Sequence, residues 1–93
     1  MPEIRIIGLH IFDRIREAGK TQEILTKYGN NIRTRYGFHE LSDDICSREG
    51  IIILEMIGNP DEWNRMEKEI NEIYGVKVKK MDFDLQNLNN KLQ

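Results

Sequence analysis

The sequence contains very little cysteine, with one residue of that type among 93. One cysteine cannot form an internal disulfide, so a reducing compartment is the simplest location, and we expect a cytoplasmic protein. Long apolar runs are missing too, since no stretch of about 18 apolar residues offers a membrane span. The N-terminal residues MPEIRIIGLHIF lack the build of a signal peptide, because Glu3 and Arg5 interrupt them. We therefore expect no contact with a membrane.

A strong charge of either sign is also missing. The 14 Lys and Arg residues and the 16 Asp and Glu residues give a formal net charge of -2. General nucleic-acid binding depends on a basic surface that attracts phosphates, so no direct DNA binding is expected. The sequence also lacks a glycine-rich phosphate loop, a GxSxG elbow and an HExxH helix. We therefore expect a protein that is not an enzyme.

The chain does have the composition of one small globular domain. Hydrophobic residues make up 39% of it and charged residues 32%, which suits a single modest core. We predict one domain over residues 1–83 and a C-terminal tail over residues 84–93. The tail has Leu85, Leu88 and Leu92 at helical spacing, which favours a short helix that needs support from a neighbour.

Hydrophobic periodicity predicts six elements in the order strand, helix, strand, strand, helix, strand. Residues 4–12 and 51–57 are apolar on both faces, which indicates strands at the centre of a sheet. The sequence Asn59-Pro60-Asp61-Glu62 is typical of a helix start, with an N-cap side chain followed by proline and two acids. The predicted strands cover 4–12, 31–38, 51–57 and 76–83, and the predicted helices cover 13–28 and 60–74. Asp13 is the expected N-cap of the first helix. The apolar stripes are Ala18, Thr21, Leu25 and Tyr28 on the first helix and Trp63, Met66, Ile70 and Ile73 on the second.

Two right-handed βαβ halves joined through a hairpin form a ferredoxin-like sandwich. The predicted fold class is therefore α+β, with a βαββαβ order, a four-stranded antiparallel sheet and two helices on one face. The apolar pattern of the last strand slips near Lys79 and Lys80, which predicts a bulge or a change of face there. Strand 31–38 is predicted to place Arg33 and Arg35 on one face and four residues on the other: Ile32, Thr34, Tyr36 and Phe38.

This sandwich leaves one sheet face without helices. Six residues of the central strands are predicted to pack under the helices: Ile7, Leu9, Ile11, Ile52, Leu54 and Met56. The opposite face would then carry Ile4, Ile6, His10, Phe12, Ile51, Ile53 and Ile57. Arg33, Arg35, Lys77 and Lys79 would lie at its rim, with Glu55 inside it as a salt-bridge partner for these basic residues. Such an apolar patch is larger than a monomer usually exposes. We therefore expect a homo-oligomer, a dimer or a tetramer, formed through the open sheet face.

His39 and Cys46 are candidate ligands for a transition metal such as nickel, zinc, copper or iron, and Asp43 and Asp44 could complete the shell. The structural alternative is a histidine at a strand end, a small buried cysteine and two turn aspartates. A Cys-His pair could also serve nucleophilic catalysis, but no basic or helix-terminal setting for Cys46 is evident.

His10 and the basic residues of the edge strands are candidate binding residues. His10 lies in the middle of the first strand, where it could bind a ligand, switch an interface with pH, or simply form a hydrogen bond. The basic residues could hold an anionic ligand, although such charges on edge strands also resist aggregation. These candidates are Arg33, Arg35, Lys77, Lys79 and Lys80.

The segments IRTRYGFHELSDDICSREGIIILEMIGNPDEW and INEIYGVKVKKMDF resemble the iron-only hydrogenase system regulators. The shared pattern is an R-x-G-x-H strand end, a C-S pair before the third strand, an acidic-capped second helix and a G-V-x-V-x-x-M-x-F strand. The resemblance covers residues from about 4 to 83. Such proteins resemble ACT-type regulatory domains and the C-terminal domain of nickel-responsive repressors, so the resemblance implies an oligomerising, ligand-sensing module.

In the nickel-responsive repressors the metal is held by histidines and a cysteine near the second and third strands and across an interface. His39 and Cys46 lie in the comparable region, and His10 is the other imidazole, but this chain lacks an HxH pair and its histidine–cysteine spacing differs. We predict a non-catalytic regulatory module that senses a small ligand or a metal ion. The alternatives are a ligand-free interaction or assembly protein supporting metalloenzyme maturation and, third, an enzyme with a ferredoxin-like fold.

Overall fold

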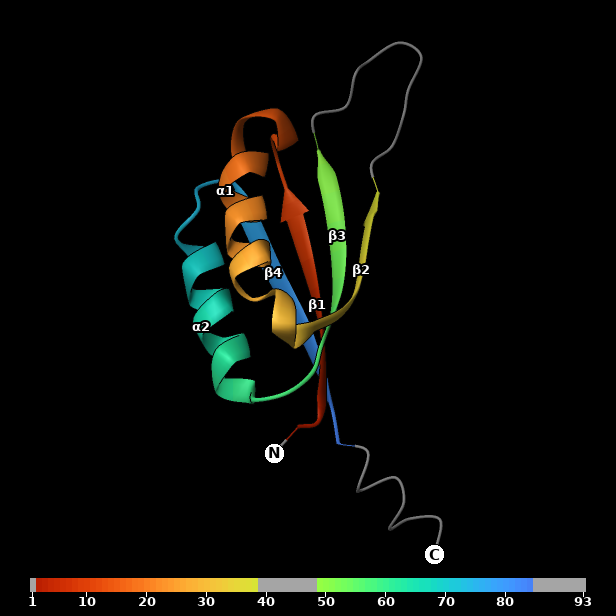
Figure 1. The fold of residues 1–93 in the computed structure, drawn as a ribbon. Helices are drawn as coiled ribbons and strands as arrows, with labels where there is room; N and C mark the ends of the chain where they lie inside the picture. Colours follow the sequence, from red (N-terminus) through yellow and green to blue (C-terminus); the bar gives the residue numbers. More distant parts are fainter. Residues whose placement is uncertain (1, 39–48, 85–93) are drawn as a thin grey trace, which may run out of the picture.

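The computed structural model describes residues 2–38 and 49–84, which form a four-stranded antiparallel sheet and two α-helices. The strand order is β2-β3-β1-β4, and both helices cover the same face of the sheet (Figure 1). The predicted α+β ferredoxin-like fold, with its first and third strands at the centre, is therefore confirmed. The elements are β1 (Ile4–Ile11), α1 (Arg14–Lys27), the 3-10 helix η1 (Gly29–Asn31), β2 (Ile32–Phe38), β3 (Gly50–Met56), α2 (Pro60–Asn71) and β4 (Val76–Phe83).

The hydrophobic core lies between the helices and the sheet. Ile7 and Leu9 of β1, Leu54 of β3, and Trp63 and Met66 of α2 are fully buried. Successive residues of a strand point to opposite faces, so the alternating burial of β1 separates a helix side from an open side. The predicted inward set of the central strands is confirmed: Ile7, Leu9, Ile11, Ile52, Leu54 and Met56.

Helix α1 begins where the sequence predicts, because Asp13 caps it. The Oδ1 atom of Asp13 accepts a hydrogen bond from the backbone N–H of Arg16 at 3.2 Å. The predicted inward stripe is buried at Thr21, Leu25 and Tyr28. The side chain of Ala18, predicted on the same stripe, lies outside the described part of the structure.

Helix α2 also has the predicted start, since Asn59 Oδ1 accepts from the backbone N–H of Asp61 at 2.9 Å. Its inward residues are the predicted ones: Trp63, Met66, Ile70 and Ile73. The helix ends at Asn71, three residues earlier than predicted. Backbone hydrogen bonds that reach back three residues, in place of the four of an α-helix, tighten the C-terminal end of α2. Gly75, with φ +87°, then turns the chain into β4.

Strand β2 differs from its predicted alternation. Its pairing with β3 shifts between Ile32, opposite Met56, and Thr34, opposite Glu55. Arg33 is the extra residue of this bulge, so Ile32 lies on the helix side and Thr34 on the open side. The prediction that these two residues share a face is therefore wrong, because the bulge lets Ile32 pack against the core.

Strand β4 is more regular than predicted, because it pairs with β1 in one uninterrupted register. The predicted bulge near Lys79 and Lys80 is therefore wrong, whereas the predicted change of face is present, because Val78 lies on the helix side and Met81 on the open side. The apolar pattern changes there because Lys80 and Asp82 lie on the helix side, where they meet Glu67 and Arg5. No helix in residues 2–38 and 49–84 is long and apolar enough to cross a membrane.

Candidate functional site

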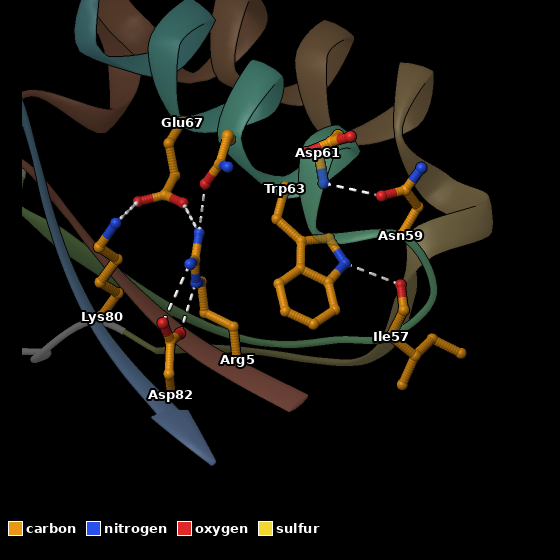
Figure 2. A network of polar contacts seen from close by, with 9 residues as sticks. Arg5, Ile57, Asn59, Asp61, Trp63, Glu67, Lys80 and Asp82 are labelled. Atoms are coloured by element: carbon orange, nitrogen blue, oxygen red, sulfur yellow. Dashed lines mark hydrogen bonds and ion pairs between the residues drawn. The ribbon is translucent and has the colours of Figure 1, made fainter. Parts of the chain in front are cut away.

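Arg5 forms the centre of a polar cluster on the helix side of the sheet (Figure 2). Its residue surface is only 6% exposed, in phase with the buried apolar residues of β1. The guanidinium donates to Asp82 Oδ1 at 2.5 Å and Oδ2 at 3.0 Å, and to Glu67 Oε2 at 2.5 Å. It also donates to Asn64 Oδ1 at 2.8 Å and lies over the ring of Trp63. These contacts join β1, α2 and β4.

The charges in this cluster compensate one another. Lys80 Nζ lies 3.6 Å from Glu67, so two cations face the two carboxylates of Glu67 and Asp82. The hydrogen bond with Asp82 raises the pKa of Arg5, and the same bond lowers the pKa of Asp82. Buried ionisable groups often mark functional sites. Here each one has an opposite charge beside it, so we interpret the cluster as a clamp that holds α2 on the sheet.

A second polar cluster joins the two helices. Lys27 Nζ donates to Glu69 Oε1 at 2.8 Å, and the Tyr28 hydroxyl donates to the same carboxylate. The hydrogen bond from Lys27 lowers the pKa of Glu69, and the bond to Glu69 raises the pKa values of Tyr28 and Lys27. This contact fixes the C-terminal end of α1 against α2 and, like the Arg5 cluster, has a structural role.

The open face of the sheet has a different character. Its residues follow from the strand register: Ile4, Ile6, Gly8 and His10 of β1, Thr34 and Tyr36 of β2, Ile51, Ile53 and Glu55 of β3, and Lys77, Lys79, Met81 and Phe83 of β4. Phe12 continues the β1 row and contacts His10, with the ring centroids 4.7 Å apart. Five of the six large hydrophobic side chains exposed in the described residues belong to this surface: Phe12, Tyr36, Ile51, Met81 and Phe83.

Charges on the β2/β3 half of the open face are balanced. Arg33 Nη2 donates to Glu55 Oε2 at 2.5 Å, and the Thr34 hydroxyl donates to Oε1 at 2.8 Å. The hydrogen bond from Arg33 lowers the pKa of Glu55. The predicted pairing of Arg33 with Glu55 is thus present. Arg35 was expected at the same rim, but it lies opposite Leu54 and so on the helix side, because the bulge changes the phase of the strand.

The β1/β4 half carries Lys77 and Lys79, next to His10 and Gly8 respectively. The ammonium group of Lys77 lies 5.4 Å from the centre of the Phe12 ring. His10 Nε2 is 3.6 Å from a carboxylate oxygen of Glu49, at the end of the sheet.

Two hollows open on this half. The first, of about 320 Å³, is lined by Gly8, Leu9, His10, Ile51, Lys77 and Lys79. The second, of about 400 Å³, is lined by Phe12, Tyr74, Gly75, Val76 and Lys77. Lys77 borders both of these neighbouring, mainly apolar depressions. The strand register brings these groups together, and sequence alone does not predict the hollows.

The predicted binding residues therefore do not form one site. His10 and Lys77 are neighbours, whereas Arg33 lies on the opposite edge strand of the sheet. The predicted metal ligands His39 and Cys46, with Asp43 and Asp44, lie outside the described residues, as do the leucines of the tail. Within the described residues, no group of three or more His, Cys, Asp or Glu side chains could hold a metal ion.

Arg5 has the most extensive polar contacts described above, and the sequence did not predict them. Its signal was a charge in phase with the apolar residues Ile7, Leu9 and Ile11, a position that requires buried partners. The partners themselves come from α2 and from β4, far along the chain. Sequence spacing therefore identifies the need for a partner but not its identity.

No family model matches the sequence, and no curated protein matches it. Among solved structures, the fold is similar to that of the uncharacterized protein TM1266 from Thermotoga maritima, with a TM-score of 0.76. The two chains share 20% sequence identity, over 90% of this chain and 100% of that one. This chain has the fold of TM1266. At this level of identity the likeness extends to the arrangement of helices and strands.

Proposed function

We propose that this protein is a non-catalytic regulatory module that assembles through its open sheet face and senses a small ligand or metal ion between protomers. The supporting observation is the concentration of exposed large hydrophobic side chains on the open face, which includes Phe12, Tyr36 and Phe83. The resemblance of the sequence to iron-only hydrogenase system regulators and ACT-type domains supports a sensing role in the cytoplasm, without direct DNA contact.

A second copy of the chain is the partner that best matches the open face. Two antiparallel sheets pack face to face about 10 Å apart when their facing sides are apolar. Ile6 and Ile53, near the middle of the open face, are only half-buried in the single chain and would become fully buried. A two-fold axis lets the same surface serve both partners, which closes the assembly.

Light scattering coupled to gel filtration at micromolar concentration tests the assembly. The wild-type protein should elute as a dimer or a tetramer. Ile53→Lys places a charge in the middle of the open face and should give a monomer, whereas Gln22→Lys on the exposed surface of α1 should leave the assembly intact. A wild-type monomer at this concentration would contradict the proposal.

A thermal-shift screen of amino acids, nucleotides and divalent metal ions tests the sensing role. A ligand that binds only the folded protein raises its melting temperature. A hit that is lost in Ile53→Lys would place the ligand between protomers. An intact oligomer with a flat screen would instead support a ligand-free assembly protein.

A further inference from the structure

The β1/β4 half of the open face has an excess of positive charge. Its described residues are Ile4, Ile6, Gly8 and His10 on β1 and Lys77, Lys79, Met81 and Phe83 on β4. Two ammonium groups are present in these two rows, and no carboxylate is. Glu49 lies beside His10 at the end of the sheet. The chain as a whole carries a net charge of -2, so this excess is a local feature.

Arg5, Arg33 and Lys80 of the sheet have carboxylate partners, whereas Arg35, on the helix side of β2, has none among the described residues. Arg33 pairs with Glu55 on the opposite half of the open face, and Lys80 lies 3.6 Å from Glu67 on the helix side. Among the described residues, Lys77 and Lys79 form no ion pair, and Lys77 contacts the Phe12 ring. If a second copy covers the open face, these ammonium groups lose water, and an unpaired charge in an interface carries a large desolvation penalty.

The two hollows beside these lysines offer space for a small molecule whose negative charge could compensate the two ammonium groups. The hollow over Gly8 has a floor without a side chain, with Ile51 on one side and both lysines on the other. The second hollow offers the Phe12 ring next to Lys77. A few polar groups around an apolar depression of roughly 300 Å³ or more are typical of small-molecule sites. The volumes of about 320 and 400 Å³ suit such a ligand.

We propose that Lys77 and Lys79 bind a small organic anion, a phosphate monoester or dicarboxylate with a flat apolar part, and that this anion completes the interface between two copies. The inference rests on the proposed function and names the class of ligand and its site. The anionic group lies between the two ammonium groups, and the flat part lies over Gly8. The charge of the ligand then neutralises the lysines when the second copy covers them.

A small ligand fits this surface better than a nucleic acid. The positive region is limited to two residues of one strand. Glu49 lies at one end of it, and on β3 Glu55 is paired with Arg33, so a longer polyanion would find no continuous basic surface. An RNA of about ten nucleotides should therefore bind less tightly than the small anions.

Calorimetric titration of the full chain with AMP and with phthalate, each compared with a neutral counterpart, tests the ligand class. Adenosine and dimethyl phthalate keep the flat part but lack the charge. At least one of the two anions should bind, and its neutral counterpart should bind at least about tenfold more weakly. The inference is overturned if neither anion binds, if the neutral compounds bind equally well, or if the RNA binds more tightly than AMP.

Matched variants test the location of the site. Lys77→Gln/Lys79→Gln should weaken binding of the anion at least about tenfold, and the control Lys20→Gln/Lys68→Gln, with the same change of charge on the helices, should not. Gly8→Val tests the hollow. A Cβ atom at Gly8 would lie 3.7 Å from Ile53 Cδ1, an ordinary contact, so the strand should accept the larger residue while the side chain blocks the flat part of the ligand. Unchanged affinity in folded Gly8→Val would contradict the proposed position.

Assembly measurements separate this inference from the function on which it rests. The anion should lower the dimer dissociation constant of the wild type at least about tenfold and leave that of Lys77→Gln/Lys79→Gln unchanged. A stable dimer that responds to another ligand but to neither anion overturns the inference and leaves the regulatory module standing. A monomer that binds nothing overturns both.

Discussion

Arg5 is the residue whose replacement should destabilise the fold most through polar contacts. In Arg5→Met the apolar stem remains, but Glu67, which is 8% exposed, keeps as a cationic partner among the described residues only the more distant Lys80. We expect a loss of about 3 kcal/mol in the free energy of unfolding, since breaking a buried ion pair leaves an uncompensated charge. Urea denaturation measures this loss. Arg65→Met, which removes an exposed partner of Glu62, should cost less than about 1 kcal/mol.

The reason for the effect can be tested within the same pair. Glu67→Met in the Arg5→Met background removes the stranded carboxylate and should recover part of the lost stability. If the double variant is as unstable as the sum of the two single variants, the loss comes from packing and not from the unpaired charge.

Asp82 should make stability depend on acidic pH. Its hydrogen bond from Arg5 lowers its pKa in the folded state below the unfolded value. The pair therefore contributes its full stabilisation above about pH 4, and that contribution is lost as the pH falls through the folded-state pKa. Asp82→Asn should be less stable than the wild type near neutral pH but should lose less stability on acidification.

Urea midpoints measured from about pH 6 down to about pH 2 check this difference. Glu23→Gln, which removes a carboxylate from the exposed surface of α1, is the control and should follow the wild-type curve. Parallel curves for Asp82→Asn and the wild type would show that the Arg5–Asp82 pair adds no pH-dependent stability.

At the scale of the elements, capping and periodicity were sufficient for the helices and the central strands. Asp13 and Asn59 each form the predicted cap, because an N-cap depends on residues close in sequence. The edge strands were less predictable, since each has a face whose neighbours come from elsewhere in the chain. Arg33 is displaced as a bulge because Ile32 packs on the core. Lys80 and Asp82 interrupt the apolar row on the helix side of β4, because Lys80 pairs there with Glu67 and Asp82 with Arg5.

At the scale of the whole molecule, the element order and the two-sided apolarity of the central strands were enough to predict the fold and its open face. The candidate site could be predicted only in part. His10, Lys77 and Lys79 were predicted on the same open face, but which of them are direct neighbours depends on the register between β1 and β4, which no local pattern sets. Within the described rows of β1 and β4, the absence of a carboxylate beside the two lysines is likewise a property of the assembled sheet.

A protein whose open face is covered by a second copy should unfold at a temperature that depends on its concentration. The reaction from folded dimer to two unfolded chains changes the number of particles, so each tenfold rise in concentration stabilises the dimer by about 1.4 kcal/mol. This corresponds to an increase of about 4 °C in the melting temperature for a dimer of this size.

Calorimetric scans across about two decades of concentration measure the dependence, and Ile53→Lys supplies the control. As a monomer, this variant should melt at one temperature at every concentration, and at a lower temperature than the wild type because Phe12, Met81 and Phe83 stay in water. A wild-type melting temperature that does not change with concentration would mean that the folded chain is stable alone. The exposed isoleucines and aromatic rings of the open face would then need a different cover, and two sheets packed face to face would no longer explain them.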